Sequence, residues 1–381
     1  MIPRFGQSSV PLDPSASPNP PRSFEGKVFV TGATGHVGAN VVRRLLAEGK
    51  DVRVLLEPAS NADAVDGLPV ERVTGDVTDL GSLETAMRGC RQAFHVAAII
   101  STTVPTPAVE RRLYDVNVTG TQNLLRVAKH QGMDRVVVTG SFSANGFDRT
   151  SPQAPADETV SHYPFDEVLP YSRSKVLVEH ECLKAAVEGL DVVIATSCAV
   201  LGPHDYIPSR MGRTLLDFAH GKLRAYVPGG FEFIAARDIA EGHWLAMQRG
   251  RSGQKYVFSS RFVSIDEMMG LWEKVTGHPK PRFRLHPTVM AGVAEVTSFV
   301  LDNFAPKVPQ RLTPAAVRIL RSQRRADTSK ARAELGFKPT RIEDAIQAAY
   351  DDFVRRGLAP RGPQPAAPPR AAQERAAEAS A

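Results

Sequence analysis

The segment T-G-A-T-G-H-V-G at residues 31–38 constrains the fold of this chain more than any other feature. It directly follows an apolar run at 28–30, typical of a strand, and directly precedes a helical pattern at 39–46. Gly32 allows a tight turn, Gly35 lets a backbone approach a pyrophosphate, and Gly38 permits close packing of the helix on the strand. The N–H groups and positive dipole end of that helix would then face the phosphates. The segment therefore predicts a dinucleotide loop, with a plain strand–turn–helix as the alternative.

Apolar, β-branched segments alternate with helical patterns over the first half of the chain. Strands are predicted at 28–30, 52–56, 70–75, 92–98, 135–139 and 192–197. Such alternation predicts an α/β fold with a doubly wound parallel sheet, covered by helices on both faces and joined by right-handed crossovers. We therefore expect a dinucleotide-binding Rossmann domain at 24–200. Beyond Gly202 the alternation weakens, which predicts a smaller substrate-binding lobe at 201–358, some of whose segments return to the sheet.

The two ends of the chain differ from the rest in composition. Residues 1–23 are rich in Pro and Ser and lack the basic start and apolar core of a secretory signal, so we expect a disordered leader. Residues 359–381 form a Pro/Ala/Arg tail that we also expect to be disordered. The three cysteines are far apart and odd in number, which argues against a disulfide framework or zinc site and favours a reducing cytoplasm. No metal is expected, because the histidines lack ligand spacing.

The formal net charge of +6 is concentrated in one part of the chain. Residues 307–341 carry ten Lys or Arg against two acids, which accounts for the whole surplus. This stretch has no interleaved aromatic residues, so nucleic acid is not expected as a partner. A solvated helix face is the plainest interpretation of the charge.

One acidic residue bears on the choice of dinucleotide. Glu57 ends the second predicted strand, about 20 residues after the glycines, where an acid hydrogen-bonds the ribose hydroxyls. A carboxylate there repels a 2′-phosphate, so we expect NAD, with NADP as the less favoured cofactor. In the alternative, Glu57 points to solvent and Arg53 binds the phosphate. Asp76, after the third strand, is placed to contact the adenine amino group, or else caps a helix.

Other cofactor contacts are expected from the loop and from the carboxyl ends of the strands, where open α/β sheets bind their ligands. These residues are Thr34, His36, Val37, Val77, Ala97, Ala98 and Ser197.

Tyr171 and Lys175, in Y-S-R-S-K, open a helical stretch after Pro170 and lie one turn apart on the same face. An adjacent cation favours the phenolate and lowers the pKa of a tyrosine from its usual value near 10, which makes Tyr171 a candidate acid or base. By itself the pattern also describes an exposed helix pair. Ser141 follows the fifth strand, where its hydroxyl could polarise a carbonyl oxygen while Tyr171 supplies the proton.

Together these residues resemble the extended short-chain dehydrogenases/reductases, also called the NAD-dependent epimerase/dehydratase group. The resemblance covers residues 27–355. Besides the glycine segment, Ser141 and Y-S-R-S-K, it rests on G-D at 75–76, F-H-V-A-A at 94–98, D-V-N-V-T-G-T-Q-N-L-L around Asn117, and D-T-S-K-A-R-A-E-L-G-F-K-P-T at 327–340. It implies that Ser141, Tyr171 and Lys175 form a catalytic triad, that Lys175 also holds the nicotinamide ribose, and that Asn117 supports a proton relay near Lys175.

Within this group the chain is most similar to dihydroflavonol-reductase-like and 3β-hydroxysteroid-dehydrogenase-like members. The similarity rests on L-G-P-H-D at 201–205, on 212–226, and on R-D-I-A-E-G-H at 237–243. Many such reductases carry Arg in place of Glu57, which puts their usual NADPH preference in doubt here. The segment after the fifth strand, G-S-F-S-A-N-G, lacks the Val-Tyr-Gly ending typical of sugar-nucleotide epimerases.

Aromatic and apolar residues near the expected site bear on the substrate. Phe142, Phe147, Tyr163 and Phe165 lie between Ser141 and Tyr171 and could wall an apolar pocket or pack in the core. An apolar stripe at 289–304 is interpreted as core, as a lid, or, with its basic neighbours at 287–325, as a peripheral membrane contact. Substrate contacts are expected from Ser141, Phe142, Ser143, Tyr171 and His204.

These features predict an NAD-linked oxidoreductase that transfers a hydride between nicotinamide and a secondary alcohol or ketone of a steroid-, lipid- or polycyclic-like substrate. A sugar-nucleotide epimerase or dehydratase with tightly bound NAD is the alternative. A cofactor-binding sensor without catalysis is disfavoured, because Ser141, Tyr171 and Lys175 are all present. A small-molecule substrate is the expected partner, with a homodimer as the candidate assembly.

Overall fold

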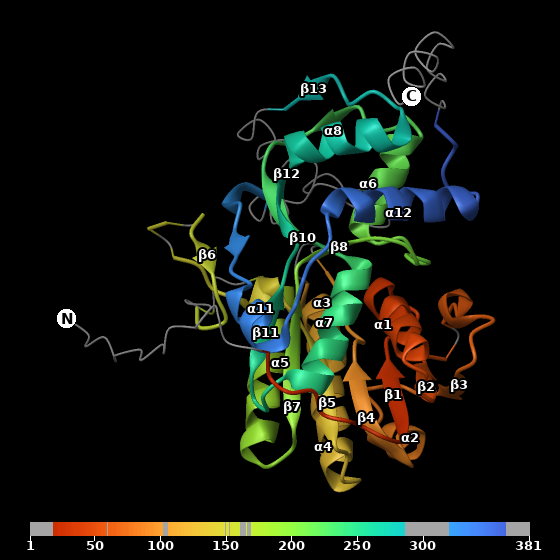
Figure 1. The fold of residues 1–381 in the computed structure, drawn as a ribbon, viewed down its shortest axis with the longest axis vertical. Coiled ribbons are helices and arrows are strands. Elements are labelled where there is room, and N and C mark those ends of the chain that lie inside the picture. Colours follow the sequence, from red (N-terminus) through yellow and green to blue (C-terminus); the bar gives the residue numbers. More distant parts are fainter. Residues whose placement is uncertain are drawn as a thin grey trace, which may run out of the picture.

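A seven-stranded parallel sheet forms the centre of the computed structural model, which describes residues 18–58, 60–101, 106–148, 150–151, 153–160, 165, 169–285 and 320–362 (Figure 1). Its strands are β1 (Lys27–Thr31), β2 (Val52–Leu56), β3 (Glu71–Thr74), β4 (Cys90–His95), β5 (Arg135–Ser141), β7 (Val192–Ser197) and β11 (Lys255–Phe258). They lie in the order β11-β7-β5-β4-β1-β2-β3, so the winding reverses between β1 and β4. This confirms the doubly wound sheet and puts the expected ligand crevice at the carboxyl ends of these two strands.

The central strands are mainly apolar and are buried on both faces, whereas the edge strand β3 alternates half-buried and exposed residues. In β1, Val28 and Val30 face one core, while Phe29 between them faces the other. Helices α1 (His36–Ala47) and α7 (Ala236–Arg249) cover the first face. Helices α2 (Leu80–Ala86), α4 (Gly120–His130) and α5 (Pro170–Val187) cover the second.

The six strands predicted from sequence are confirmed to within a few residues, and a seventh, β11, was not predicted. β11 follows residue 201 in the chain and pairs in parallel with β7 at the edge of the sheet. Its apolar part is only Tyr256–Phe258, too short a run for periodicity to separate a strand from a helix. Only its pairing with β7 makes it a strand.

A second group of elements lies beyond the carboxyl ends of the sheet (Figure 1). It contains a three-stranded sheet of β8 (Ala199–Leu201), β10 (Gly230–Ala235) and β12 (Arg261–Ser264). Helices α6 (Arg210–Ala219), α8 (Ile265–Thr276) and α12 (Ile342–Arg355) pack with it around the edge-to-face pair Phe218–Trp272. By contrast, α11 (Ser329–Leu335) packs against β11 and α7.

Short elements complete the described chain. Two small parallel pairs join β9 (Ala225–Tyr226) to β13 (Phe283–Arg284) and β6 (Pro155–Ala156) to β14 (Arg325–Ala326). Helix α3 (Pro107–Leu113) runs into the π-helical η2 (Tyr114–Thr119), while η1 (Asp63–Val65) and η3 (Phe142–Ala144) are 3₁₀ turns. None of the helices in the described residues is long and apolar enough to span a membrane.

Parts of both ends that were expected to be disordered instead make defined contacts with the fold. The backbone N–H of Asn19 donates to Glu334 O at 2.7 Å, and that of Arg22 donates to Gln248 O at 2.9 Å. At the other end, the Tyr350 hydroxyl donates to Pro360 O at 2.7 Å and accepts from the N–H of Gly362 at 2.8 Å. Residues 18–23 and 359–362 are therefore docked on the fold, because partners distant in sequence pair with their backbone.

Candidate active site

The glycine segment forms a cradle at the carboxyl end of β1. Gly32 has a φ of +70°, and a Cβ there would lie 2.5 Å from the Ala97 nitrogen, so this turn accepts only glycine. A Cβ at Gly38 would lie 2.0 Å from Gly32 O, which explains the close packing of α1 on the turn. Gly35 is the N-cap of α1, and no side chain accepts the first-turn N–H groups there. The cradle fits a dinucleotide pyrophosphate, since those N–H groups and the helix dipole bind anions.

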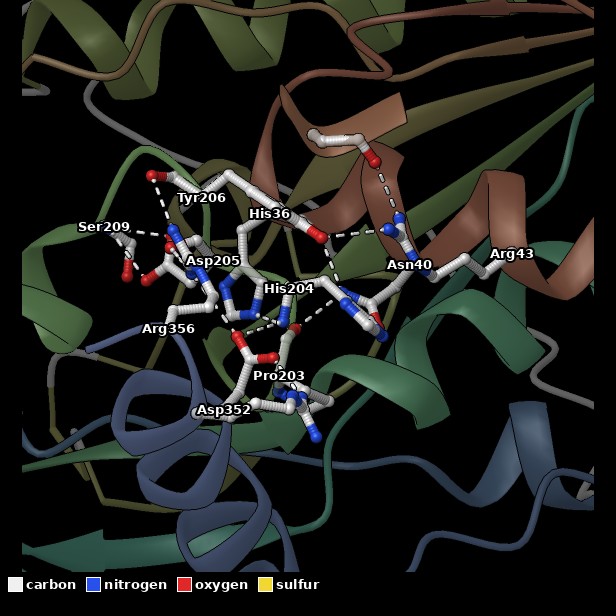
Figure 2. A network of polar contacts seen from close by, with 12 residues as sticks. His36, Asn40, Arg43, Pro203, His204, Asp205, Tyr206, Ser209, Asp352 and Arg356 are labelled. Carbon is white, nitrogen blue, oxygen red and sulfur yellow. Dashed lines mark hydrogen bonds and ion pairs between the residues drawn. The ribbon is translucent and has the colours of Figure 1, made fainter. Parts of the chain in front are cut away.

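His36 follows the cradle but its side chain faces elsewhere. Thr34 and Val37 are half-buried in the turn, whereas the His36 imidazole Nε2 lies 3.2 Å from Pro203 O (Figure 2). Burial lowers the pKa of His36, so the ring is neutral. Asn40 Nδ2 also donates to Pro203 O, at 3.0 Å. The His36 side chain therefore joins α1 to the 203–209 loop, which leaves only its backbone for a phosphate contact.

The predicted ribose-reading residue is exposed at the end of β2. Glu57 directly follows Leu56, the last residue of that strand. The side chain of Arg53, the alternative phosphate ligand, is already paired with other groups. Its Nε lies 2.9 Å from Glu71 Oε2, and its Nη1 donates to Ala86 O and Arg88 O. Of these two charged side chains, Glu57, directly after β2, is therefore the one available to the cofactor.

The two residues after β3 have local structural contacts. Asp76 Oδ1 accepts the N–H of Thr78 at 2.8 Å, whereas Asp79 is the N-cap of α2. Val77 is buried beside Gly120, where a Cβ would lie 2.8 Å from the valine Cγ2. Asp76 thus shapes the turn, and the helix cap that was its alternative role belongs to Asp79.

Three further predicted cofactor positions lie at the same sheet edge. Ala97 and Ala98 follow β4 and are half-buried, with the Ala97 N–H donating to Thr31 Oγ1 at 3.2 Å. Ser197 ends β7 directly opposite Ser141 of β5, and its hydroxyl donates to Cys198 O at 3.0 Å.

Ser141, Tyr171 and Lys175 meet at the carboxyl end of β5 and the start of α5. The Ser141 hydroxyl is hydrogen-bonded to the Tyr171 phenol and lies 2.9 Å from Ser143 Oγ. Lys175 is buried, and its Nζ donates to Thr139 O at 3.0 Å. The fold therefore joins a hydroxyl, a phenol and an ammonium group from segments some thirty residues apart.

The electrostatics of this group differ from the expectation for Tyr171. Burial raises the pKa of the Tyr171 phenol, and the hydrogen bond with Ser141 lowers it only in part. Burial also lowers the pKa of Lys175, from 10.5 to about 8. The expected lowering of the tyrosine pKa by the lysine is thus absent here, since Lys175 is desolvated and directed at Thr139 O. The proton rests on Tyr171 in this state.

Asn117 lies in the π-helical η2, whose widened turn is common at functional sites. Its Oδ1 accepts the N–H of Ile99 at 2.8 Å, and its Nδ2 donates to Ile99 O and to Ser174 Oγ, both at 3.0 Å. The side chain thus ties the segment after β4 to α5. Its relay role near Lys175, implied by the family resemblance, stays a prediction.

The expected substrate residues fall into two places. Phe142 is buried, and the Arg324 guanidinium lies over its ring at 5.1 Å and over that of Phe147 at 5.0 Å. Ser143 lies beside Ser141, and Phe165 is partly exposed. Tyr163 and the apolar stripe at 289–304 lie outside the described residues. Arg324, which no sequence pattern singled out, also donates to the Gly146 carbonyl at 3.0 Å and fixes the segment after Ser141.

His204 belongs to a polar network between α1, the 203–209 loop and α12 (Figure 2). It adopts a φ of +65°, its N–H donates to Asp352 Oδ2 at 3.1 Å, and its ring stacks on Tyr206. Arg43 donates to the Tyr206 hydroxyl at 3.2 Å, and Arg356 donates to Asp205 O at 3.0 Å. An open cavity of about 580 Å³ borders this network. His204 thus helps to join the two groups of elements, and its hydrogen bond and ring contact within the described part of the chain are with Asp352 and Tyr206.

His243 is hydrogen-bonded to Thr139, the residue that binds Lys175, and the sequence did not reveal this contact. Its Nδ1 donates to Ile239 O at 2.8 Å, so its Nε2 must accept from the Thr139 hydroxyl, 2.7 Å away. Thr139 is the residue whose carbonyl binds Lys175. The motif at 237–243 pointed to this histidine, but its partner lies 104 positions earlier in the chain.

The buried His243 gives a testable pH dependence of stability. Burial lowers its pKa from 6.5 to about 4. The unfolded chain therefore takes up a proton that the folded chain does not, and stability falls as the pH drops from 6.5 to 4. The pKa difference is equivalent to ~3 kcal/mol. We expect His243→Gln to flatten the decline in the unfolding free energy, measured by urea denaturation across this range. The exposed His180, changed to Gln, should leave the slope unaltered, and an unaltered slope in His243→Gln would refute the assignment.

A glycine cradle at the switch point of the sheet, with a phenol and an ammonium group at the neighbouring strand end, serves an enzyme that works on a CH–OH/C=O pair with a nicotinamide dinucleotide. The chain belongs to the NAD-dependent epimerase/dehydratase family, whose model matches residues 28–258. The resemblance and fold class inferred from sequence are thereby confirmed.

Relatives and solved structures agree with this assignment. Sterol demethylase protein B of Methylococcus capsulatus is 40% identical over 87% of this chain and 99% of its own length. A 3β-hydroxysteroid-dehydrogenase/decarboxylase of Arabidopsis thaliana is 27% identical over 85% of this chain and 61% of its own. The dTDP-glucose 4,6-dehydratase of Streptomyces venezuelae, solved with NAD, has a TM-score of 0.69 and 23% identity over 87% of this chain and 98% of its own. A nucleoside-diphosphate-sugar epimerase of Pseudomonas aeruginosa has a TM-score of 0.72 and 23% identity, with 88% and 100% covered. The last two show the fold alone.

Proposed function

We propose that this enzyme oxidises the 3β-hydroxyl group of a sterol-type substrate with NAD. The observation that carries the proposal is the 40% identity to a sterol demethylase component, which extends over 99% of that protein. The similarity to a 3β-hydroxysteroid-dehydrogenase/decarboxylase supports the 3β-hydroxyl group as the position oxidised.

The residues of the chain supply proton transfer and orientation. NAD bound in the cradle would accept the hydride and its electron pair from the carbinol carbon. The Ser141 hydroxyl orients the substrate oxygen. Tyr171 first releases its own proton to bulk water, and its phenolate oxygen then receives the proton of the substrate hydroxyl. Lys175 supplies the positive charge that favours the phenolate once substrate and cofactor exclude water. The Thr139 carbonyl, braced by His243, holds that ammonium group in place.

A decarboxylation accompanies this chemistry for one class of substrate. If the carbon next to the carbinol carries a carboxyl group, oxidation yields a β-keto acid. Such an acid loses CO₂ and leaves the ketone, with the electron pair of the broken C–C bond passing to the enolate. The decarboxylase in the name of the Arabidopsis relative supports this substrate class.

The test is a panel of 3β-hydroxysterols, with and without a neighbouring carboxyl group, incubated with NAD. We expect NADH formation by absorbance, a 3-ketone product by mass spectrometry, and CO₂ release from the carboxylated members alone. A nucleotide sugar isomerised or dehydrated without net NADH formation would instead establish the alternative reaction.

We further propose that NAD is preferred to NADP through Glu57. Replacement by arginine converts repulsion of the 2′-phosphate into attraction. We expect Glu57→Arg to raise the NADP/NAD ratio of kcat/KM about tenfold or more, equivalent to ~1.4 kcal/mol. Initial rates with each dinucleotide measure the ratio. The exposed Glu188, changed to Arg on the far side of α5, is the control for added charge, and equal ratios in both variants would show that Glu57 does not contact the ribose.

A further inference from the structure

Two sets of hydrogen bonds, linked covalently through Asn117, connect the cradle to the catalytic helix through His95. Thr31 directly precedes Gly32, and its hydroxyl oxygen lies 2.8 Å from His95 Nδ1. His95 Nε2 lies 3.0 Å from Thr121 Oγ1, which donates to Asn117 O at 2.6 Å. The Asn117 side-chain Nδ2 donates to Ser174 Oγ at 3.0 Å. The Ser174 hydroxyl in turn donates to the backbone carbonyl of Tyr171 at 2.7 Å.

The ends of these two sets fix the position of every proton in them. Thr121 and Ser174 both donate to backbone carbonyls, which can only accept. The Thr121 hydroxyl has a single proton, so it must accept from His95 Nε2–H. The Thr31 hydroxyl accepts the N–H of Ala97, and its own proton goes to the unprotonated Nδ1 of His95. His95 therefore has one permitted form, the neutral Nε2–H tautomer.

The surroundings of His95 favour this form. Its side chain is 2% exposed, and both ring nitrogens are occupied by threonines that are themselves buried. Burial, together with the nearby Lys175 ammonium group, lowers the pKa of His95 to about 3. The ring therefore stays neutral at physiological pH. It accepts a hydrogen bond from Thr31 at Nδ1 and donates one to Thr121 from Nε2.

We propose that His95 is a positioning residue, which in its Nε2–H form sets the dinucleotide cradle relative to the helix that carries Tyr171 and Lys175. The bridge joins elements that touch different reactants: β1 leads into the phosphate turn, and α5 carries the acid/base. Its effect on turnover rests on the proposed function, whereas its effect on NAD binding does not.

The first test addresses the tautomer without any ligand. Protein labelled with ¹⁵N-histidine is examined by long-range ¹H–¹⁵N NMR, and the His95 signals are identified by their loss in His95→Gln. We expect an unprotonated Nδ1 and a protonated Nε2, both unchanged from about pH 5 to 8. An Nδ1–H tautomer, or a titration near the ordinary histidine pKa, would overturn the proposal.

The second test addresses coupling between the two ends. Thr121→Val removes the acceptor of His95 at the end remote from the cradle, and Thr121→Ser retains it. We expect NAD Kd, measured by calorimetry, to rise roughly fivefold in Thr121→Val and to return to the wild-type value in Thr121→Ser. Thr196→Val is the matched control, since Thr196 is also fully buried and its hydroxyl has no hydrogen-bond partner within the described residues. Its NAD Kd should stay within about twofold.

A purely structural role predicts a different outcome. Thr121→Val would then lose stability in thermal unfolding while Thr196→Val would not, yet the folded fraction of Thr121→Val would bind NAD as the wild type does, and this would refute the positioning role. Where the sterol panel is oxidised, we also expect kcat to fall about tenfold in Thr121→Val alone. If no sterol is oxidised, the proposed function fails, while the NMR and calorimetric results still decide the role of His95.

Discussion

Tyr171→Phe is expected to abolish turnover while NAD binding is preserved. The substitution removes one oxygen atom, the atom that exchanges the substrate proton, and leaves the ring packing on α5 intact. General acid–base catalysis contributes about 10² to 10⁴ in rate, so kcat should fall by that factor. The glycine cradle is untouched, and NAD Kd by calorimetry should stay within about threefold.

The control for this variant is Tyr114→Phe, because Tyr114 is 47% exposed and lies outside the triad. It should retain wild-type kcat. If Tyr171→Phe kept more than about a tenth of the wild-type rate, another group would have to move the proton, and the acid/base assignment would be wrong.

Lys175→Met is expected to separate activity from stability. Removing the ammonium group deprives the phenolate of its cation, so kcat should fall about 10² to 10⁴-fold. Stability should respond in the opposite direction. Burial lowers the pKa of Lys175 from 10.5 to about 8, so a charged lysine at pH 7 costs the fold ~3 kcal/mol. Removing the charge therefore raises the free energy of unfolding. The loss of the hydrogen bond to Thr139 O reduces that increase by about 1–3 kcal/mol.

The pH dependence of the unfolding free energy tests the burial of Lys175 more directly than its value at pH 7. Between pH 8 and 10.5 the unfolded chain holds a proton on Lys175 that the folded chain has released, so wild-type stability gains from this residue as the pH rises through this window. Lys175→Met should lack that gain in urea unfolding free energies. The same substitution at the exposed Lys184, whose side chain is 66% exposed, should leave the gain in place. A Lys175→Met variant whose stability changed with pH as the wild type does would show that the lysine is not desolvated.

The central strands of the sheet were predictable because they are local, mainly apolar runs that the sheet buries on both faces. The exception, β11, has only three apolar residues in sequence and becomes a strand by pairing with β7. Likewise, the composition of residues 18–23 indicated disorder, but Asn19 and Arg22 find backbone partners on α11 and α7, contacts that no local pattern encodes.

The sequence by itself identified the candidate groups for chemistry and cofactor binding: the glycines of the cradle, Ser141, Tyr171, Lys175 and the acidic Glu57, since each depends on residue type and short-range spacing. Tertiary structure alone decided how those groups are held and charged. It directed His36 toward Pro203, placed His243 behind Thr139, raised the pKa of Tyr171 by burial, and joined Thr31 to Tyr171 through His95. The reason is physical: hydrogen-bond direction and desolvation arise from groups brought together across the fold, and no spacing along the chain records which groups will meet.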